Sequence, residues 1–191
     1  MPVNTETICS YFMRKFAIFS GIIFISIVAA GLYGIIHDQI TYSISPEYFT
    51  KFKYRQFGFE PAWFGGDRPT VAVIGFLATW WTGLFIGFGL GLTALIFNDH
   101  KAMRAAANRA IFIVMAIAMI SGFAGFLYGK FVLADAGVDW WLPNDLQNKA
   151  AFITVGSIHN FSYLGGLLGL VVGIVYLLRR KYLQRIALGT R

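Results

Sequence analysis

Histidine is the residue in this chain best suited to chemistry near neutral pH, and two of its three copies fall where polar side chains are rare. His159 lies inside a long apolar run, and His37 comes at the end of another. Imidazole nitrogens bind transition metals and haem iron, and they exchange protons near pH 7. Polar groups inside such runs are costly and often functional. These two histidines are therefore the first candidates for a site.

The spacing around each histidine predicts that both face the interior of a helix bundle. At helical spacing His159 shares a face with Ser162 and several glycines, and the face of His37 carries Ser26 and Tyr33. Both histidines are expected in the outer half of the membrane and could approach one another. The candidate polar or ligand cluster is His37, Asp38, Glu47, His159 and Asn160.

Three kinds of chemistry fit this candidate cluster. A hydrogen-bonded network would orient the helices. A metal ion could bind His37 and His159 with a carboxylate from Asp38 or Glu47. The two histidines could also be axial ligands of one haem b if they lie at matched depth. The cofactor therefore stays open between haem b, a metal ion and none, and enzymatic activity is left undecided.

The elements that would hold these side chains are four apolar runs, at residues 16–36, 71–97, 110–129 and 150–178. About 20 apolar residues suffice for a helix to cross the hydrocarbon layer, and backbone groups there must be satisfied internally. The sequence therefore predicts an all-α integral membrane protein with four transmembrane helices, forming a single domain over residues 1–191.

The loop after the first run is predicted to contain a short amphipathic helix. Ser45, Pro46 and Glu47 form a helix start, with a hydroxyl cap, a proline at the first position and an acid in the first turn. Aromatic residues follow on one side until Gly58. Such a segment, with lysines beside it, is typical of a helix lying in the membrane interface.

Charge orients the predicted bundle. The chain is 57% hydrophobic and 13% charged, with a net charge of +7, and ten of its sixteen Lys and Arg residues fall on one side of the four runs. The positive-inside rule places that side, with both termini, in the cytoplasm. We expect a plasma or bacterial inner membrane, a first span that is retained, lipid contacts for the basic residues and no nucleic-acid partner.

Glycines at four-residue spacing predict where the helices pack. Small residues at this spacing let two helix backbones approach closely in lipid. They occur on the second and fourth runs, at Gly83, Gly87, Gly91, Gly165, Gly169 and Gly173.

The single cysteine, Cys9, excludes a dithiol redox pair within the chain, and no nucleotide-binding loop or hydrolase motif is present. The leading hypothesis is a multi-pass, non-catalytic subunit or scaffold of a larger membrane complex, packed against other subunits or itself. The alternative is a haem- or metal-binding redox protein, or a small transporter, that uses His37 and His159 in the outer half of the bundle.

Overall fold

A computed structural model describes residues 5–189 and confirms the all-α prediction: no strand occurs among these residues. Residues 1–4 and 190–191 of the predicted domain lie outside the described part. Four helices in this part are long and apolar enough to span a membrane. They are α1 (Thr5–Ile44), α4 (Asp67–Ala94), α5 (His100–Tyr128) and α7 (Lys149–Gly189).

The helices do not end where the apolar runs end. The first helix continues well past residue 36, so His37 and Asp38 lie inside a helix rather than in a loop. The second ends at Ala94, before residue 97, because the chain must turn back within a few residues to begin α5. Asp99 caps that next helix by accepting a hydrogen bond from the Ala102 backbone N–H at 2.7 Å.

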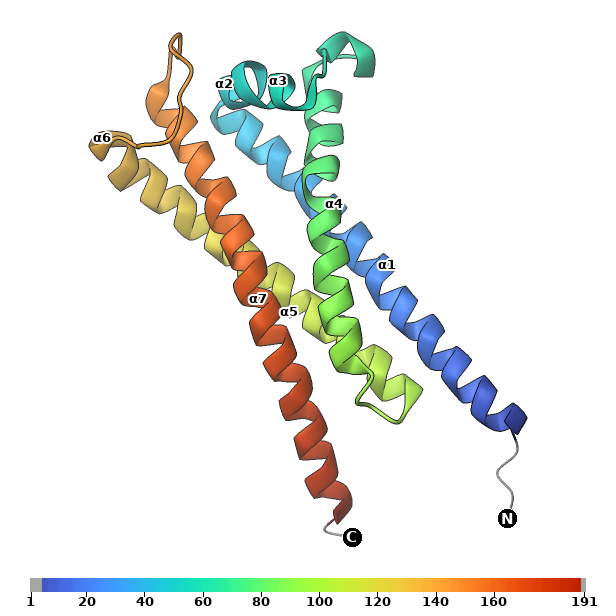
Figure 1. Cartoon of the computed structure of the whole chain (residues 1–191). Helices are drawn as coiled ribbons and strands as arrows, with labels where there is room; N and C mark the ends of the chain where they lie inside the picture. Colours follow the sequence, from blue (N-terminus) through green and yellow to red (C-terminus); the bar gives the residue numbers. More distant parts are fainter. Residues whose placement is uncertain (1–4, 190–191) are drawn as a thin grey trace.

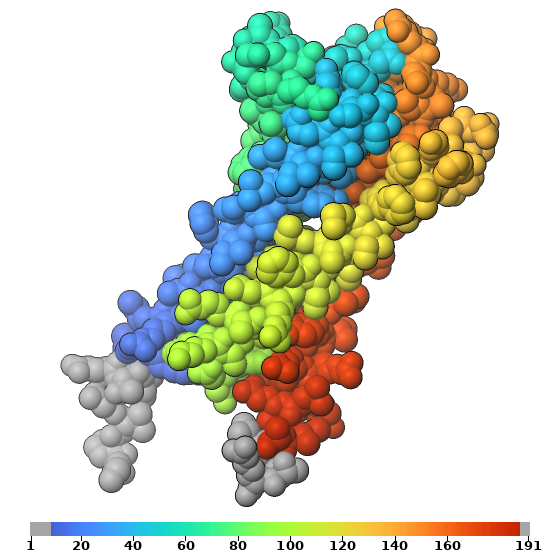
Figure 2. All heavy atoms as spheres, turned by 180° about the vertical axis from the view of Figure 1, so that it is seen from behind, coloured from blue at the N-terminus to red at the C-terminus, as the bar shows by residue number. Residues whose placement is uncertain are grey.

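The four long helices form two antiparallel hairpins. In one, α1 packs along α4, and in the other α5 packs along α7, whereas contacts between the two hairpins are far fewer. The start of α1 and the end of α7 lie at the same end of the bundle (Figure 1). From behind, α1 and α5 run beside one another with a small opening between them (Figure 2).

The glycines at four-residue spacing lie inside the hairpins. A Cβ added to Gly87 of α4 would lie 2.8 Å from the Ile23 Cα of α1, and Gly83 and Gly91 face the same helix. A Cβ added to Gly169 of α7 would lie 2.8 Å from the Val114 Cα of α5. Gly165 faces α5, and Gly173 faces both α5 and Leu90 of α4. Backbone therefore lies against backbone within each pair.

The loop between α1 and α4 folds over one end of the bundle (Figure 1). It contains α2 (Pro46–Tyr48), a π-helical turn η1 (Phe49–Lys53), α3 (Tyr54–Phe57) and a short 3₁₀ helix η2 (Pro61–Phe64). We call residues 46–57 the capping segment. Its aromatic side faces the protein, with Tyr48, Phe49 and Tyr54 buried. The other loop at this end begins with η3 (Gly129–Leu133) and α6 (Ala134–Ala136).

Two buried apolar clusters hold the bundle together. One joins all four long helices toward the end with the termini, and includes Ile22, Leu90, Met103 and Leu177. The other lies under the capping segment and joins Tyr48, Phe49, Tyr54, Val71, Ile74, Phe152 and Val155. The histidine-bearing stretches of α1 and α7 lie between these clusters.

Candidate functional site

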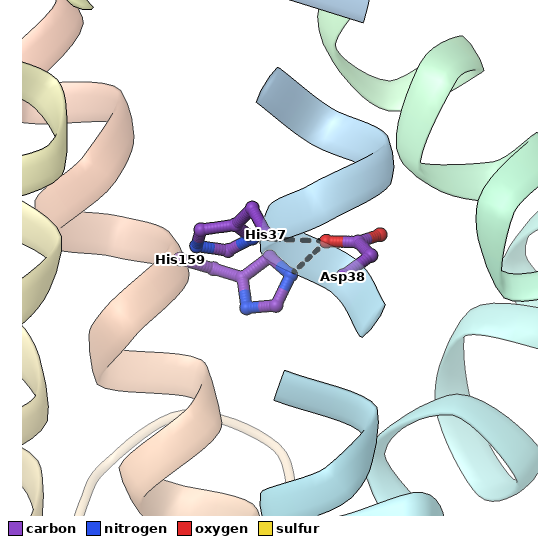
Figure 3. Close-up of side chains that lie close together, drawn as sticks. All are labelled: His37, Asp38 and His159. Carbon is purple, nitrogen blue, oxygen red and sulfur yellow. Dashed lines mark hydrogen bonds and ion pairs between the residues drawn. The ribbon is translucent and has the colours of Figure 1, made fainter. Parts of the chain in front are cut away.

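Three of the predicted residues meet between the two hairpins. His37 and Asp38 come from α1 and His159 comes from α7, and one ligand atom from each lies within 4.8 Å of the others. The Nδ1 of His37 is 3.0 Å from Asp38 Oδ1, and the Nε2 of His159 is 3.2 Å from the same oxygen (Figure 3). Asp38 and His159 are buried.

The surroundings of His159 decide which of its nitrogens carries hydrogen. Its Nδ1 lies 2.9 Å from the carbonyl oxygen of Val155, one turn earlier on α7. A carbonyl oxygen only accepts, so Nδ1 must donate. In the neutral ring, Nε2 then presents a lone pair to the carboxylate oxygen of Asp38. Two acceptors cannot bond directly, so a proton or a metal cation must lie between them.

A chain of hydroxyl groups fixes the other histidine. The Nε2 of His37 lies 3.2 Å from the Ser162 hydroxyl, which accepts a hydrogen bond from the Tyr33 hydroxyl at 3.2 Å. The serine oxygen can also accept from Nε2. In that tautomer His37 Nδ1 carries no hydrogen and offers a lone pair to a cation beside Asp38 Oδ1. Outer hydrogen bonds of this kind, to a hydroxyl or a backbone carbonyl, are what orient metal-binding histidines.

Asp38 has unused binding capacity. Its Oδ2 atom is buried and has no hydrogen-bond partner among the described residues, although unpaired buried carboxylate oxygens are costly. Two ligands bound about 2.0–2.2 Å from a tetrahedral ion lie roughly 3.3–3.6 Å apart. The two nitrogen–oxygen distances in the cluster are only slightly shorter. The three residues therefore form a compact set of two imidazoles and a carboxylate.

The same geometry disfavours haem. The ring centroids of His37 and His159 are 4.7 Å apart, at an interplanar angle of 89°. Axial ligands lie on opposite faces of a porphyrin, so a macrocycle would have to fit between the two rings. Their edge contact and their shared bond to Asp38 leave no such space.

The capping segment covers the cluster. Tyr48 stacks on His159 with ring centroids 4.8 Å apart, and burial raises the pKa of its hydroxyl. On the same segment, Lys53 is buried with its Nζ near three aromatic rings, 5.3 Å from the Phe52 centroid. Burial lowers the pKa of Lys53, and among the described residues no acid lies within ion-pair distance of it.

Two of the predicted cluster residues lie elsewhere. Asn160 is exposed, because the next residue along a helix points about 100° away from His159. Glu47 accepts hydrogen bonds from the backbone N–H groups of Gln147 and Asn148, at 3.0 and 2.8 Å, and pairs with Lys51. It thereby ties the capping segment to the chain just before α7, and it supplies no ligand atom to the site.

An elongated cavity of about 470 Å³ opens beside the cluster. All four long helices contribute to its wall, which is mostly apolar. His37, Asp38 and His159 lie at one end of it, and Ile111 and Met115 of α5 lie farther along. A volume of this size is within the range of small-molecule sites.

Sequence reasoning did not anticipate the parts contributed by the loop. The stacking of Tyr48 on His159 and the burial of Lys53 depend on how the capping segment folds back, and η1 shifts the residues that follow out of α-helical register. The hydroxyl chain was detectable, since Tyr33 and Ser162 share helix faces with the two histidines.

No protein-family model, curated protein or solved structure matches this chain, so its function is inferred from its own residues.

Proposed function

We propose that this membrane protein binds one divalent transition-metal ion through His37 Nδ1, His159 Nε2 and the carboxylate of Asp38. The observation that carries the proposal is the pair of facing acceptors: His159 donates from Nδ1 to the Val155 carbonyl and turns Nε2 toward Asp38 Oδ1. A cation between these atoms satisfies both. The orphaned Oδ2 of Asp38 gives the carboxylate a second oxygen for the ion.

The donor set narrows the choice of metal. Imidazole suits Zn²⁺, Fe²⁺, Ni²⁺ and Cu²⁺, and two histidines with one carboxylate are the ligands of many zinc and non-haem iron sites. Three protein ligands leave a coordination position for water or a substrate. His37, Asp38 and His159 all line the cavity, so an open position would face a space large enough for a small molecule.

The test is metal binding by the purified full chain in lipid nanodiscs. After chelation and dialysis, Zn²⁺ and Fe²⁺ are titrated separately and bound metal is counted by mass spectrometry. We expect one tightly held ion per chain, and we expect His159→Gln and Asp38→Asn to lose it. The matched control is His100→Gln, which changes the third histidine, near the opposite end of the bundle.

Two outcomes would overturn this proposal. One is a wild-type protein that retains no metal, which would mean that a proton bridges His159 and Asp38. The other is a His159→Gln variant that binds as tightly as the wild type. Helix content by circular dichroism, compared with that of His100→Gln, separates loss of the site from loss of the fold.

We further propose that both termini lie in the cytoplasm of a plasma or bacterial inner membrane, as the positive-inside bias indicates. The single cysteine allows a direct test, because Cys9 is exposed on α1. A membrane-impermeant maleimide added to intact cells should leave Cys9 unlabelled. It should label a cysteine placed in the α6–α7 loop by Asn144→Cys in a Cys9→Ser background. The reverse pattern would invert the topology.

Membership of a larger complex stays a prediction. The outward faces of the four long helices carry many exposed apolar side chains, such as Phe112 and Ile120 of α5. Apolar faces of this kind can contact either lipid or another subunit, so their exposure does not show which of the two covers them. Mass measurement of the nanodisc or mild-detergent particle would decide whether further chains accompany this one.

A further inference from the structure

The cavity beside the cluster has the form of a site for a lipid-like chain. Ser26 and His37 both line it, and their positions on α1 place them about 16 Å apart along the helix axis. Most of the other side chains that line the cavity are aliphatic or aromatic, and they include Ile86, Val114 and Leu170. A single extended apolar chain matches this length and lining.

Access to the cavity is from the side of the bundle. Trp81 and Phe85 of α4, with Tyr163 and Leu167 of α7, line the cavity and are also among the exposed large side chains of the protein. These residues lie in segments expected to cross the hydrocarbon layer. A molecule dissolved in the membrane could therefore enter between α4 and α7 without passing through water.

The polar atoms at the cluster end select the head group. The Tyr33 hydroxyl donates to Ser162, and the Tyr163 hydroxyl donates to the Ala78 carbonyl at 3.2 Å. Their hydrogens are used within the protein, so their oxygens are left as acceptors. Among the described residues, no lysine or arginine lines the cavity, and Asp38 contributes a carboxylate. A head group that donates a hydrogen bond fits these groups, whereas an anion does not.

We propose that the cavity binds a neutral, lipid-soluble molecule with a hydroxyl head, a long-chain alcohol or phenol in chemical terms. The head lies at the cluster end near Tyr33 and His159, and the tail extends toward Met115. Binding rests on the cavity and its hydrogen-bond acceptors, and it does not require the metal ion.

Photolabelling tests this proposal on metal-free full-length protein in nanodiscs. The probe is 1-decanol with a diazirine in the chain, and labelled residues are mapped by mass spectrometry. We expect saturable labelling of the cavity wall, around Met115 and Leu170. Excess decanol should compete best, its methyl ether less well because it donates no hydrogen bond, and decanoate least.

A glycine pair supplies matched variants. Gly166 lines the cavity, and a Cβ added there would meet nothing closer than Ile86 at 4.0 Å, so Gly166→Leu fills the space without striking backbone. Gly21 of α1 is also helical, an added Cβ there meets nothing within 4 Å, and it is outside the cavity lining. Gly166→Leu should lower cavity labelling roughly tenfold, because the leucine side chain occupies space that the probe needs. Gly21→Leu should leave it unchanged.

Three results would overturn the proposal. Labelling of the cavity wall that excess decanol does not reduce would mean that the probe only samples the lipid. Equal labelling of Gly166→Leu and wild type would place the probe outside the cavity. Competition by decanoate as strong as that by decanol would contradict the hydroxyl head group. Because the protein is free of metal, each of these results leaves the metal proposal to its own titration.

Discussion

The interfaces inside the two hairpins differ in kind from the interface between them. Inside a hairpin, glycines bring backbone against backbone, as Gly87 does against Ile23 and Gly169 against Val114. Between the hairpins, side chains meet across a cavity of about 470 Å³ and through the His37–Asp38–His159 cluster. The hairpins are therefore closely packed units, and the proposed metal site lies at their junction.

The residues of the proposed metal site come from both hairpins. Asp38 and His37 belong to the α1–α4 pair, and His159 belongs to the α5–α7 pair. An ion bound to all three would join the two units at a place where direct packing is sparse. The capping segment makes a second bridge at the same end, because Glu47 of the first loop accepts hydrogen bonds from Gln147 and Asn148 near the start of α7.

The largest expected effect is a clash inside a hairpin. In Gly169→Leu the new side chain would meet the Val114 backbone, which cannot move without separating α5 from α7. We expect a loss of about 3 kcal/mol or more in unfolding free energy, at the top of the usual range for overpacked sites. Reversible unfolding in mixed micelles measures it.

The matched control for that clash is Gly166→Leu, on the same helix but facing the cavity. We expect little or no loss of stability there, and a small gain is allowed because leucine favours helix more than glycine does. Equal destabilisation by the two substitutions would remove the distinction between tight hairpins and a loose junction.

The next largest effect is the stabilisation of the folded protein by a metal ion bound between the two hairpins. A ligand that binds only the folded state at one hundred times its Kd stabilises it by about 2.7 kcal/mol. Unfolding followed at rising free Zn²⁺ should show this gain in the wild type and in His100→Gln. His159→Gln should show no gain. A zinc-dependent gain of the same size in His159→Gln would place the ion somewhere else.

A smaller effect is expected from the hydroxyl chain. Ser162→Ala removes the partner of His37 Nε2 but leaves all three ligands in place. Loss of such an outer hydrogen bond lowers metal affinity by roughly 10- to 100-fold. Competition with a zinc-binding dye measures the change. An unchanged affinity would mean that Ser162 does not orient the ring.

The smallest effect concerns the contact of Glu47 with the chain before α7, which is the second connection between the two hairpins. Backbone hydrogen bonds from Gln147 and Asn148, with the Lys51 ammonium, lower the pKa of Glu47 to about 2, from an ordinary value of 4.5. Its contribution to stability is therefore present above pH 4.5 and is lost as the pH falls toward 2. Glu47→Gln should lower the melting temperature slightly at neutral pH, and the difference from wild type should shrink across that acid range. A difference that is constant with pH would contradict this role.

The fold and the residues at the centre of the site could be predicted from the sequence. The way in which the capping segment covers the site could not. Long apolar runs give helices in lipid whatever their neighbours, and helical spacing fixes which residues share a face with His159. That His37, Asp38 and His159 lie close together follows from the helix face that each occupies and from their similar depth in the membrane. Tyr48 and Lys53 could not be placed this way, because the path of a loop depends on tertiary packing and not on periodicity.

Two of the predicted cluster residues do not reach the site. Glu47 is a candidate ligand because it is a carboxylate on the outer side of the bundle, yet the backbone N–H groups of Gln147 and Asn148 hold it away from the histidines. Asn160 is a candidate because it lies in the outer half, but adjacent residues on a helix point in different directions, so it does not share the face of His159. Depth in the membrane alone does not bring side chains together.

The most direct test of the metal site is X-ray absorption spectroscopy at the zinc edge on the zinc-loaded full chain. We expect two imidazole nitrogens at about 2.0–2.1 Å and at least one carboxylate oxygen at about 2.0–2.2 Å. His159→Gln, loaded with zinc and dialysed in the same way, should retain too little zinc to give this spectrum. A spectrum with oxygen ligands only, or one that His159→Gln leaves unchanged, would contradict a metal site at the junction of the two hairpins.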